Sequence, residues 1–169
     1  MQNVLIGGIG NVMLGDHGTG PFAIKVLESQ YAFDSAVKLV QLPASVVDLQ
    51  PYLSGADIAI LINAVDFGGQ PGDIRLFRER DMLTPFRALK GEFLLSLQRL
   101  DTMPSKLLLI GMQGRRFTPG LQLSTPVRDC IPHVIDAVLR ELRSLGVSYL
   151  PRPSSRLKAF GSLISQRAA

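Results

Sequence analysis

The chain has 169 residues, of which 46% are hydrophobic and 19% charged, a composition typical of one globular domain with a sizeable core. It has no run of 18 or more apolar residues, which argues against a membrane-spanning helix. The formal net charge is +4, and all of it lies in residues 147–169, which contain no acid. The neutral body has no basic face with interleaved aromatic residues, which argues against nucleic acid as a partner.

The number of cysteines and the position of the first strand indicate the cellular compartment of the protein. Cys130 is the single cysteine, so no internal disulfide can form, and a cytoplasmic location is expected. A first strand that begins almost at Met1 leaves no room for a signal peptide. Cys130 lies on the apolar side of a helical pattern, where a small core residue is favoured over a reactive thiol.

The first elements surround a glycine-rich stretch. Residues 2–7 form an apolar run that predicts a buried strand, and residues 18–30 show the spacing of an amphipathic helix. The turn between them starts like a dinucleotide-binding fingerprint, but Met13 stands at the third glycine position and the acid expected about 20 residues on is absent. The glycines also suit a tight turn with close strand–helix packing, and Asp16 suits a helix cap.

The following elements alternate along the chain. We expect strands at 36–42 and 57–63, an antiparallel edge strand at 73–77, and a strand at 106–110. We expect helices at 43–53, 86–100 and 124–145, the last kinked or divided at Pro132, with Ser124 as a cap and Gly146 as a stop. Residues 147–169 are expected to form a basic, solvated tail.

This alternation predicts one α/β domain over residues 1–146. Its architecture is a three-layer sandwich, with a mainly parallel, five-stranded twisted sheet and helices on both faces. Loops 8–20, 63–72 and 111–120 follow strand ends, so they are expected to meet at one edge of the sheet.

Two motifs give a resemblance. Gly8-Ile9-Gly10-Asn11, followed by Leu14-Gly15-Asp16 and the 18–21 run, resembles the opening motif of the hydrogenase maturation endopeptidases. The segment 63–68, with Pro71-Gly72 and Arg75-Leu76-Phe77, resembles their second motif. The resemblance runs in order over residues 3–146.

The resemblance implies a function. These endopeptidases remove the C-terminal extension of the nickel–iron hydrogenase large-subunit precursor. They hold no catalytic metal of their own and recognise nickel already present in that substrate. Recognition uses a carboxylate after the first strand, an aspartate ending the third strand, and a histidine near the start of the helix before the fifth strand. Carboxylate and imidazole are suitable nickel ligands.

This chain differs from the family at all three positions. His17 replaces the carboxylate, Asn63 replaces the aspartate, and Arg87 stands near the histidine position. The candidate metal ligands are therefore His17 and Asn63, with Asp16 and Asp66 as weaker candidates. His17 can ligate a metal when neutral, whereas Arg87 is a permanent cation. The remaining candidates, expected to line the binding surface with Arg87, are Gly10, Asn11 and Gln113.

Two functions follow, and the sequence does not decide between them. The chain is either a processing endopeptidase with an altered ligand set, or a non-proteolytic relative. The second would bind a hydrogenase subunit or another maturation factor as a chaperone or scaffold. A third hypothesis, a small-molecule or nucleotide enzyme, has only the first glycine turn in its favour and lacks the third glycine, the ribose-binding acid and a phosphate-binding lysine.

Overall fold

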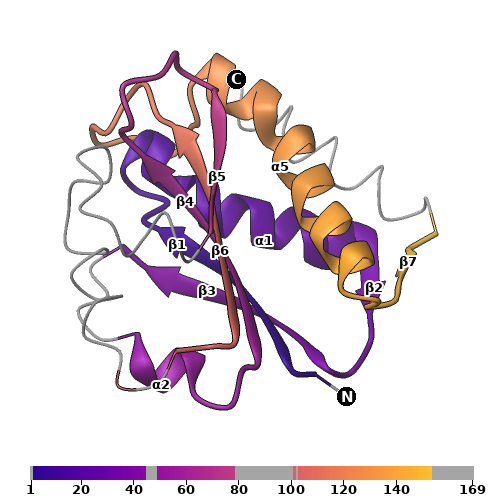
Figure 1. Cartoon of the computed structure of the whole chain (residues 1–169). Coiled ribbons are helices and arrows are strands. Elements are labelled where there is room, and N and C mark those ends of the chain that lie inside the picture. The colour runs from indigo at the N-terminus through magenta and orange to yellow at the C-terminus, as the bar shows by residue number, and fades with distance from the viewer. Residues whose placement is uncertain (1, 45–48, 79–100, 102, 154–169) are drawn as a thin grey trace.

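The computed structural model describes residues 2–44, 49–78, 101 and 103–153 (Figure 1). Its centre is a five-stranded sheet in the order β3-β1-β4-β6-β5. The strands are β1 (Val4–Gly10), β3 (Val37–Pro43), β4 (Ile58–Val65), β5 (Ile74–Arg78) and β6 (Lys106–Gln113). All neighbours are parallel except β5, which pairs antiparallel with β6 at one edge, as the short link before it predicted.

Helices cover both faces of the sheet, which confirms the predicted three layers. In Figure 1, α1 (Thr19–Gln30) and α5 (Thr125–Ser144) lie together on one face, while α2 (Gln50–Leu53) packs on the other. A short 3-10 helix, η1 (Gly15–Gly18), leads into α1. The predicted helix 86–100, with Arg87 in it, lies outside the described residues.

Two apolar layers form the core. One fills the space between the sheet and α1 and α5, and the other lies under α2. Strands β4 and β6 are buried along almost their whole length, as expected for central strands covered on both faces. Apolar residues at helical spacing within 124–145 predict the inward face of the last helix, and all seven are buried: Val127, Ile131, Val134, Ile135, Val138, Leu139 and Leu142.

The last helix ends as predicted but is not divided. Gly146 has φ +71°, and the N–H groups of Gly146 and Val147 donate to the carbonyls of Arg143 and Leu142. This pattern is a Schellman motif, which requires a residue in the left-handed region. Pro132 lies within one continuous helix, so of the two expected outcomes the division does not occur. Its exposed position lets water reach the carbonyl that loses its helical partner.

The chain after α5 differs from the expected solvated tail. Residues Tyr149–Pro151 form β7, which pairs antiparallel with β2 (Tyr31–Phe33), a strand that we did not predict. The rings of Tyr31, Phe33 and Tyr149 contact one another across this ribbon. Such aromatic cross-strand contacts stabilise the short strand pair. Strands of three residues are too short to show an alternating pattern in the sequence. Among the described residues, no helix has the length and apolarity needed to cross a bilayer.

Candidate functional site

The site lies where the strand order reverses. From β1 the chain crosses to β3 on one side, and β4 and β6 follow on the other side. In open α/β sheets, ligands bind in the crevice outside the carboxyl ends of the strands at such a switch point. The residues that end β1 and β4 therefore border the expected site.

Because α1 packs closely on β1, the segment that joins them, residues 11–18, lies over this edge of the sheet. A side chain on Gly8 would collide with the Gly20 carbonyl, and one on Gly20 would collide with the backbone of Ile9. A side chain on Gly10 would meet the carbonyl of His17. The glycines thus serve close strand–helix packing, the simpler of the two interpretations of the sequence.

Asp16 is buried in η1 and joins this segment to the loop after β6 and to the start of α5. Its carboxylate accepts hydrogen bonds from the N–H groups of Arg115 (2.8 Å), Arg116 (2.8 Å) and Ser124 (2.6 Å), and from the Ser124 hydroxyl (2.9 Å). Burial alone would raise the pKa of Asp16, but these hydrogen bonds outweigh it and the pKa is lowered.

The four donors give Asp16 a structural role. They occupy both oxygens, and the residue is 0% exposed, so the carboxylate is not positioned to ligate an ion. It does not cap α1 either, because Gly18 is the N-cap residue of that helix. Ser124 is the N-cap residue of α5, as predicted, but its hydroxyl donates to Asp16 instead of capping the helix.

His17 is half-buried in η1, and its ring packs on Phe117 with centroids 4.5 Å apart. Burial lowers the pKa of His17, and the nearby Asp16 charge opposes this shift only in part. The imidazole is therefore neutral near pH 7. A neutral imidazole has a nitrogen lone pair for a metal.

Asn63 lies inside β4, and not at its end as we expected, because β4 continues to pair with β6 up to Val65. It pairs with Ile9 of β1 and Gly111 of β6. The residue is 8% exposed, and its side-chain amide makes no hydrogen bond with another described residue. Since η1 packs against both β1 and β4, His17 and Asn63 lie at the same edge of the sheet.

Gln113 organises the neighbouring loop. Its side-chain oxygen accepts from the N–H groups of Phe67 (2.9 Å) and Gly69 (3.1 Å). Its amide nitrogen donates to Asp66 Oδ1 (3.2 Å) and to the Gly114 carbonyl (3.2 Å). All four hydrogen-bonding sites are used, so Gln113 positions the loop and cannot also bind a ligand directly. Asp66 is exposed beside it.

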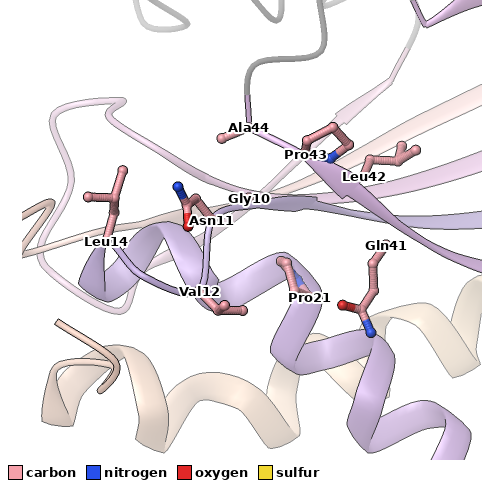
Figure 2. Close-up of a pocket in the computed structure, with 9 residues that line it drawn as sticks. All are labelled: Gly10, Asn11, Val12, Leu14, Pro21, Gln41, Leu42, Pro43 and Ala44. Atoms are coloured by element: carbon pink, nitrogen blue, oxygen red, sulfur yellow. The ribbon is translucent and has the colours of Figure 1, made fainter. Parts of the chain in front are cut away.

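A cleft of about 600 Å³ opens at the ends of β1 and β3 (Figure 2). Gly10 and Asn11, two of the candidate binding residues, line it, and the Asn11 side chain accepts from the Met13 N–H (2.9 Å). Neither His17 nor Asn63 is among its lining residues. The His17 ring packs instead on Phe117, in the loop that follows β6.

The three predicted loops do meet at this edge. Met13 and Gly15 exchange backbone hydrogen bonds with Gly120 (2.9 and 2.7 Å), and the side chain of Gln113 joins the loop after β4 to the end of β6. Sequence reasoning missed the partners Phe117 and Gly120. Nothing in their local sequence marks them, because each acts across about 100 residues of chain.

The described residues contain no group of three or more His, Cys, Asp or Glu side chains that could hold a metal ion. Cys130 packs against the core, and burial first, then the charges of Asp129 and Asp73, raise its pKa, so the thiol is not activated. His133 is exposed on α5. Of the candidate ligands, the neutral side chains of His17 and Asn63 are the two that lie at this edge without a hydrogen bond to another described residue.

The fold and this edge define an α/β protein with a ligand crevice at its switch point. A profile of the hydrogenase maturation proteases (HycI) matches residues 21–141, and the chain belongs to this family.

Individual relatives agree with this assignment. HupD, a hydrogenase expression/formation protein of Bradyrhizobium diazoefficiens, is 31% identical over 157 residues, covering 87% of this chain and 81% of HupD. The hydrogenase 2 maturation protease of Escherichia coli is 25% identical over 159 residues, covering 89% of this chain and 97% of the protease. The solved structure of the E. coli endopeptidase HybD has the same fold, with a TM-score of 0.79 and 24% identity. That match covers 92% of this chain and 100% of HybD.

Proposed function

We propose that this protein is a processing endopeptidase for the large-subunit precursor of a nickel–iron hydrogenase. Its substrate is the precursor that already carries nickel, and it removes the C-terminal extension in the cytoplasm. The observation that supports this proposal is the packing of η1 against β1 and β4, which brings His17 and Asn63 to one edge of the sheet. We call the ligand site expected there, outside the carboxyl ends of β1 and β4, the crevice. By the resemblance of the two motifs, His17 and Asn63 stand at the positions of the family's carboxylates.

The ligand set of this crevice is neutral. The His17 imidazole offers a nitrogen lone pair, and the Asn63 amide, which has no protein partner among the described residues, offers a carbonyl oxygen. Nickel in the substrate can polarise the scissile carbonyl. Because two carboxylates are replaced, the crevice attracts this cation less strongly, so we expect slower cleavage than in a family member with both carboxylates.

The neighbouring cleft gives the substrate chain a place to bind. Its lining includes the backbone of Gly10 and the side chains of Asn11 and Pro21, from β1 and the first turn of α1 (Figure 2). A volume of about 600 Å³ suits a few residues of an extended peptide. Peptide bound there would lie next to the crevice.

The neutral Asn63 also supports a second candidate, a non-proteolytic family member that binds the precursor, or another maturation factor, as a scaffold. Such a protein needs the docking surface but no ligand that holds the cation strongly. Binding without cleavage would distinguish it from the endopeptidase.

The test combines the protein with nickel-loaded and nickel-free large-subunit precursor from its own organism. Mass spectrometry of the precursor then reports loss of the C-terminal peptide. We expect loss only with nickel, faster with Asn63→Asp, slower with His17→Ala, and unchanged with Asp136→Asn, an exposed control on α5. An intact but bound precursor would support the scaffold, and an intact, unbound precursor would refute both candidates.

A further inference from the structure

Exposed apolar side chains gather on two loops beside the crevice. The loops are residues 11–18, which include η1, and residues 114–124. Eight large hydrophobic residues are exposed among those the structure describes, and four of them lie on these loops. We call them the loop patch: Val12 (42% exposed), Met13 (59%), Phe117 (37%) and Leu121 (60%). Single exposed apolar residues are ordinary, but a cluster of them marks an interaction site.

Hydrogen bonds hold the loop patch in place. The Gly15 N–H donates to the Gly120 carbonyl (2.7 Å), and the Gly120 N–H donates to the Met13 carbonyl (2.9 Å). The Asp16 N–H donates to the Arg116 carbonyl (2.8 Å). The buried Asp16 carboxylate binds the same loop by accepting from the Arg115 N–H. A surface that is already ordered loses little entropy when a partner binds.

The loop patch is continuous with the proposed site. Val12 also lines the cleft at the end of β1, and the Phe117 ring packs on His17. A peptide that reaches the crevice would therefore extend over the loop patch on one side.

The exposed charges on the two loops themselves are positive. Arg115 and Arg116 are exposed, and the only acid on the two loops is the buried Asp16. The Arg115 side chain forms no hydrogen bond or ion pair with another described residue, while its backbone N–H donates to Asp16. A partner that complements this surface has apolar side chains flanked by carboxylates.

We propose that the loop patch binds the large-subunit precursor through a segment next to its processing site. This segment presents apolar side chains to Met13 and Leu121 and carboxylates to Arg115 and Arg116. The proposal rests on the proposed function, because it takes the precursor as the partner.

The experiment measures binding of purified protein to immobilised, nickel-loaded precursor by biolayer interferometry. Met13→Glu and Leu121→Glu each place a charge in the loop patch, and Leu150→Glu is the matched control, because Leu150 is 71% exposed on the distant β7. We expect Kd to rise at least about tenfold for the two loop variants and to stay unchanged for the control. Far-UV circular dichroism and Tm confirm that all three variants are folded.

Arg115→Glu tests the charge separately. It leaves the backbone hydrogen bond to Asp16 intact, and we expect weaker binding with a reduced dependence on salt. If the wild type cleaves the precursor and the variants bind it as well as the wild type, the loop patch proposal is overturned while the function stands. A wild type that neither binds nor cleaves overturns the function. Wild-type dimers that Met13→Glu dissociates, with unchanged Kd, would assign the loop patch to self-association.

Discussion

Replacing the buried carboxylate of Asp16 by an amide should reveal how strongly it joins the two loops. In Asp16→Asn the amide oxygen is best placed at Oδ2, which accepts from Arg115, Arg116 and the Ser124 hydroxyl. The amide NH₂ then faces the Ser124 N–H, which donates to Oδ1 at 2.6 Å in the wild type. One buried donor is left without an acceptor.

The loss of stability follows from these four bonds. A buried donor without a partner costs roughly 1–3 kcal/mol, and each of the other three bonds weakens by roughly 0.5–1 kcal/mol when its acceptor loses its charge. These ranges together span roughly 2.5–6 kcal/mol, so we expect Asp16→Asn to lower the free energy of unfolding by about 4 kcal/mol. For a domain of this size, that corresponds to a fall in Tm of roughly 10 °C.

The dependence on pH identifies the charge as the cause. Because the pKa of Asp16 is lower in the folded protein than in the unfolded chain, its ionisation stabilises the fold at pH values above the unfolded pKa of about 3.9. This contribution is lost as the pH falls through the folded pKa. The difference in stability between the wild type and Asp16→Asn should therefore be largest near pH 7 and shrink in acid.

Urea unfolding followed by circular dichroism at pH 7 and at several lower pH values measures both effects. Asp136→Asn, which removes an exposed charge from α5, is the control and should change the free energy of unfolding by less than about 0.5 kcal/mol. A loss below about 1 kcal/mol in Asp16→Asn, or one that is the same at every pH, would refute the reasoning.

Three other predictions concern the same edge of the fold. NMR titration of His17 should give a pKa below 6.5, and Phe117→Ala should raise it by exposing the ring to water. Gly20→Ala should destabilise the fold by about 3 kcal/mol or more, seen as a lower Tm, because the added methyl collides with β1. Gln113→Leu should speed hydrogen exchange of the Gly69 amide at least about tenfold, because that N–H loses its acceptor.

Each of these predictions has a clear contrary result. A His17 pKa above 6.5, or one that Phe117→Ala leaves unchanged, would contradict the buried position of the ring. Lys25→Ala, at an exposed position of α1, is the control for Gly20→Ala. If the two variants had the same Tm, the close packing of Gly20 on β1 would be contradicted. For Gln113→Leu, unchanged exchange of the Gly69 amide would contradict its hydrogen bond to Gln113. The Arg128 amide in the first turns of α5 is the control and should exchange at its wild-type rate.

The sequence by itself determined the five strands of the central sheet, the helices α1 and α5, the order of these elements and the class of fold. Periodicity identified the inward face of α5, the uniform apolar runs identified β4 and β6, and Gly146 marked the end of the last helix. These signals are readable because each depends on residues a few positions apart, which the local geometry of a helix or strand relates directly. The spacing of the two glycine-bearing motifs likewise indicated the family.

Only the tertiary structure decided what the polar residues of the site do. Asp16 was a candidate cap or ligand, but Ser124, 108 residues away, makes it a structural anchor. Gln113 was a candidate binding residue, and its bonds to the loop after β4 show it to be a positioning residue. Such bonds form between segments that only folding brings together, so no local pattern in the sequence predicts them. The β2–β7 pair was missed for the same reason: three-residue strands are too short to show a period, and their pairing joins distant parts of the chain.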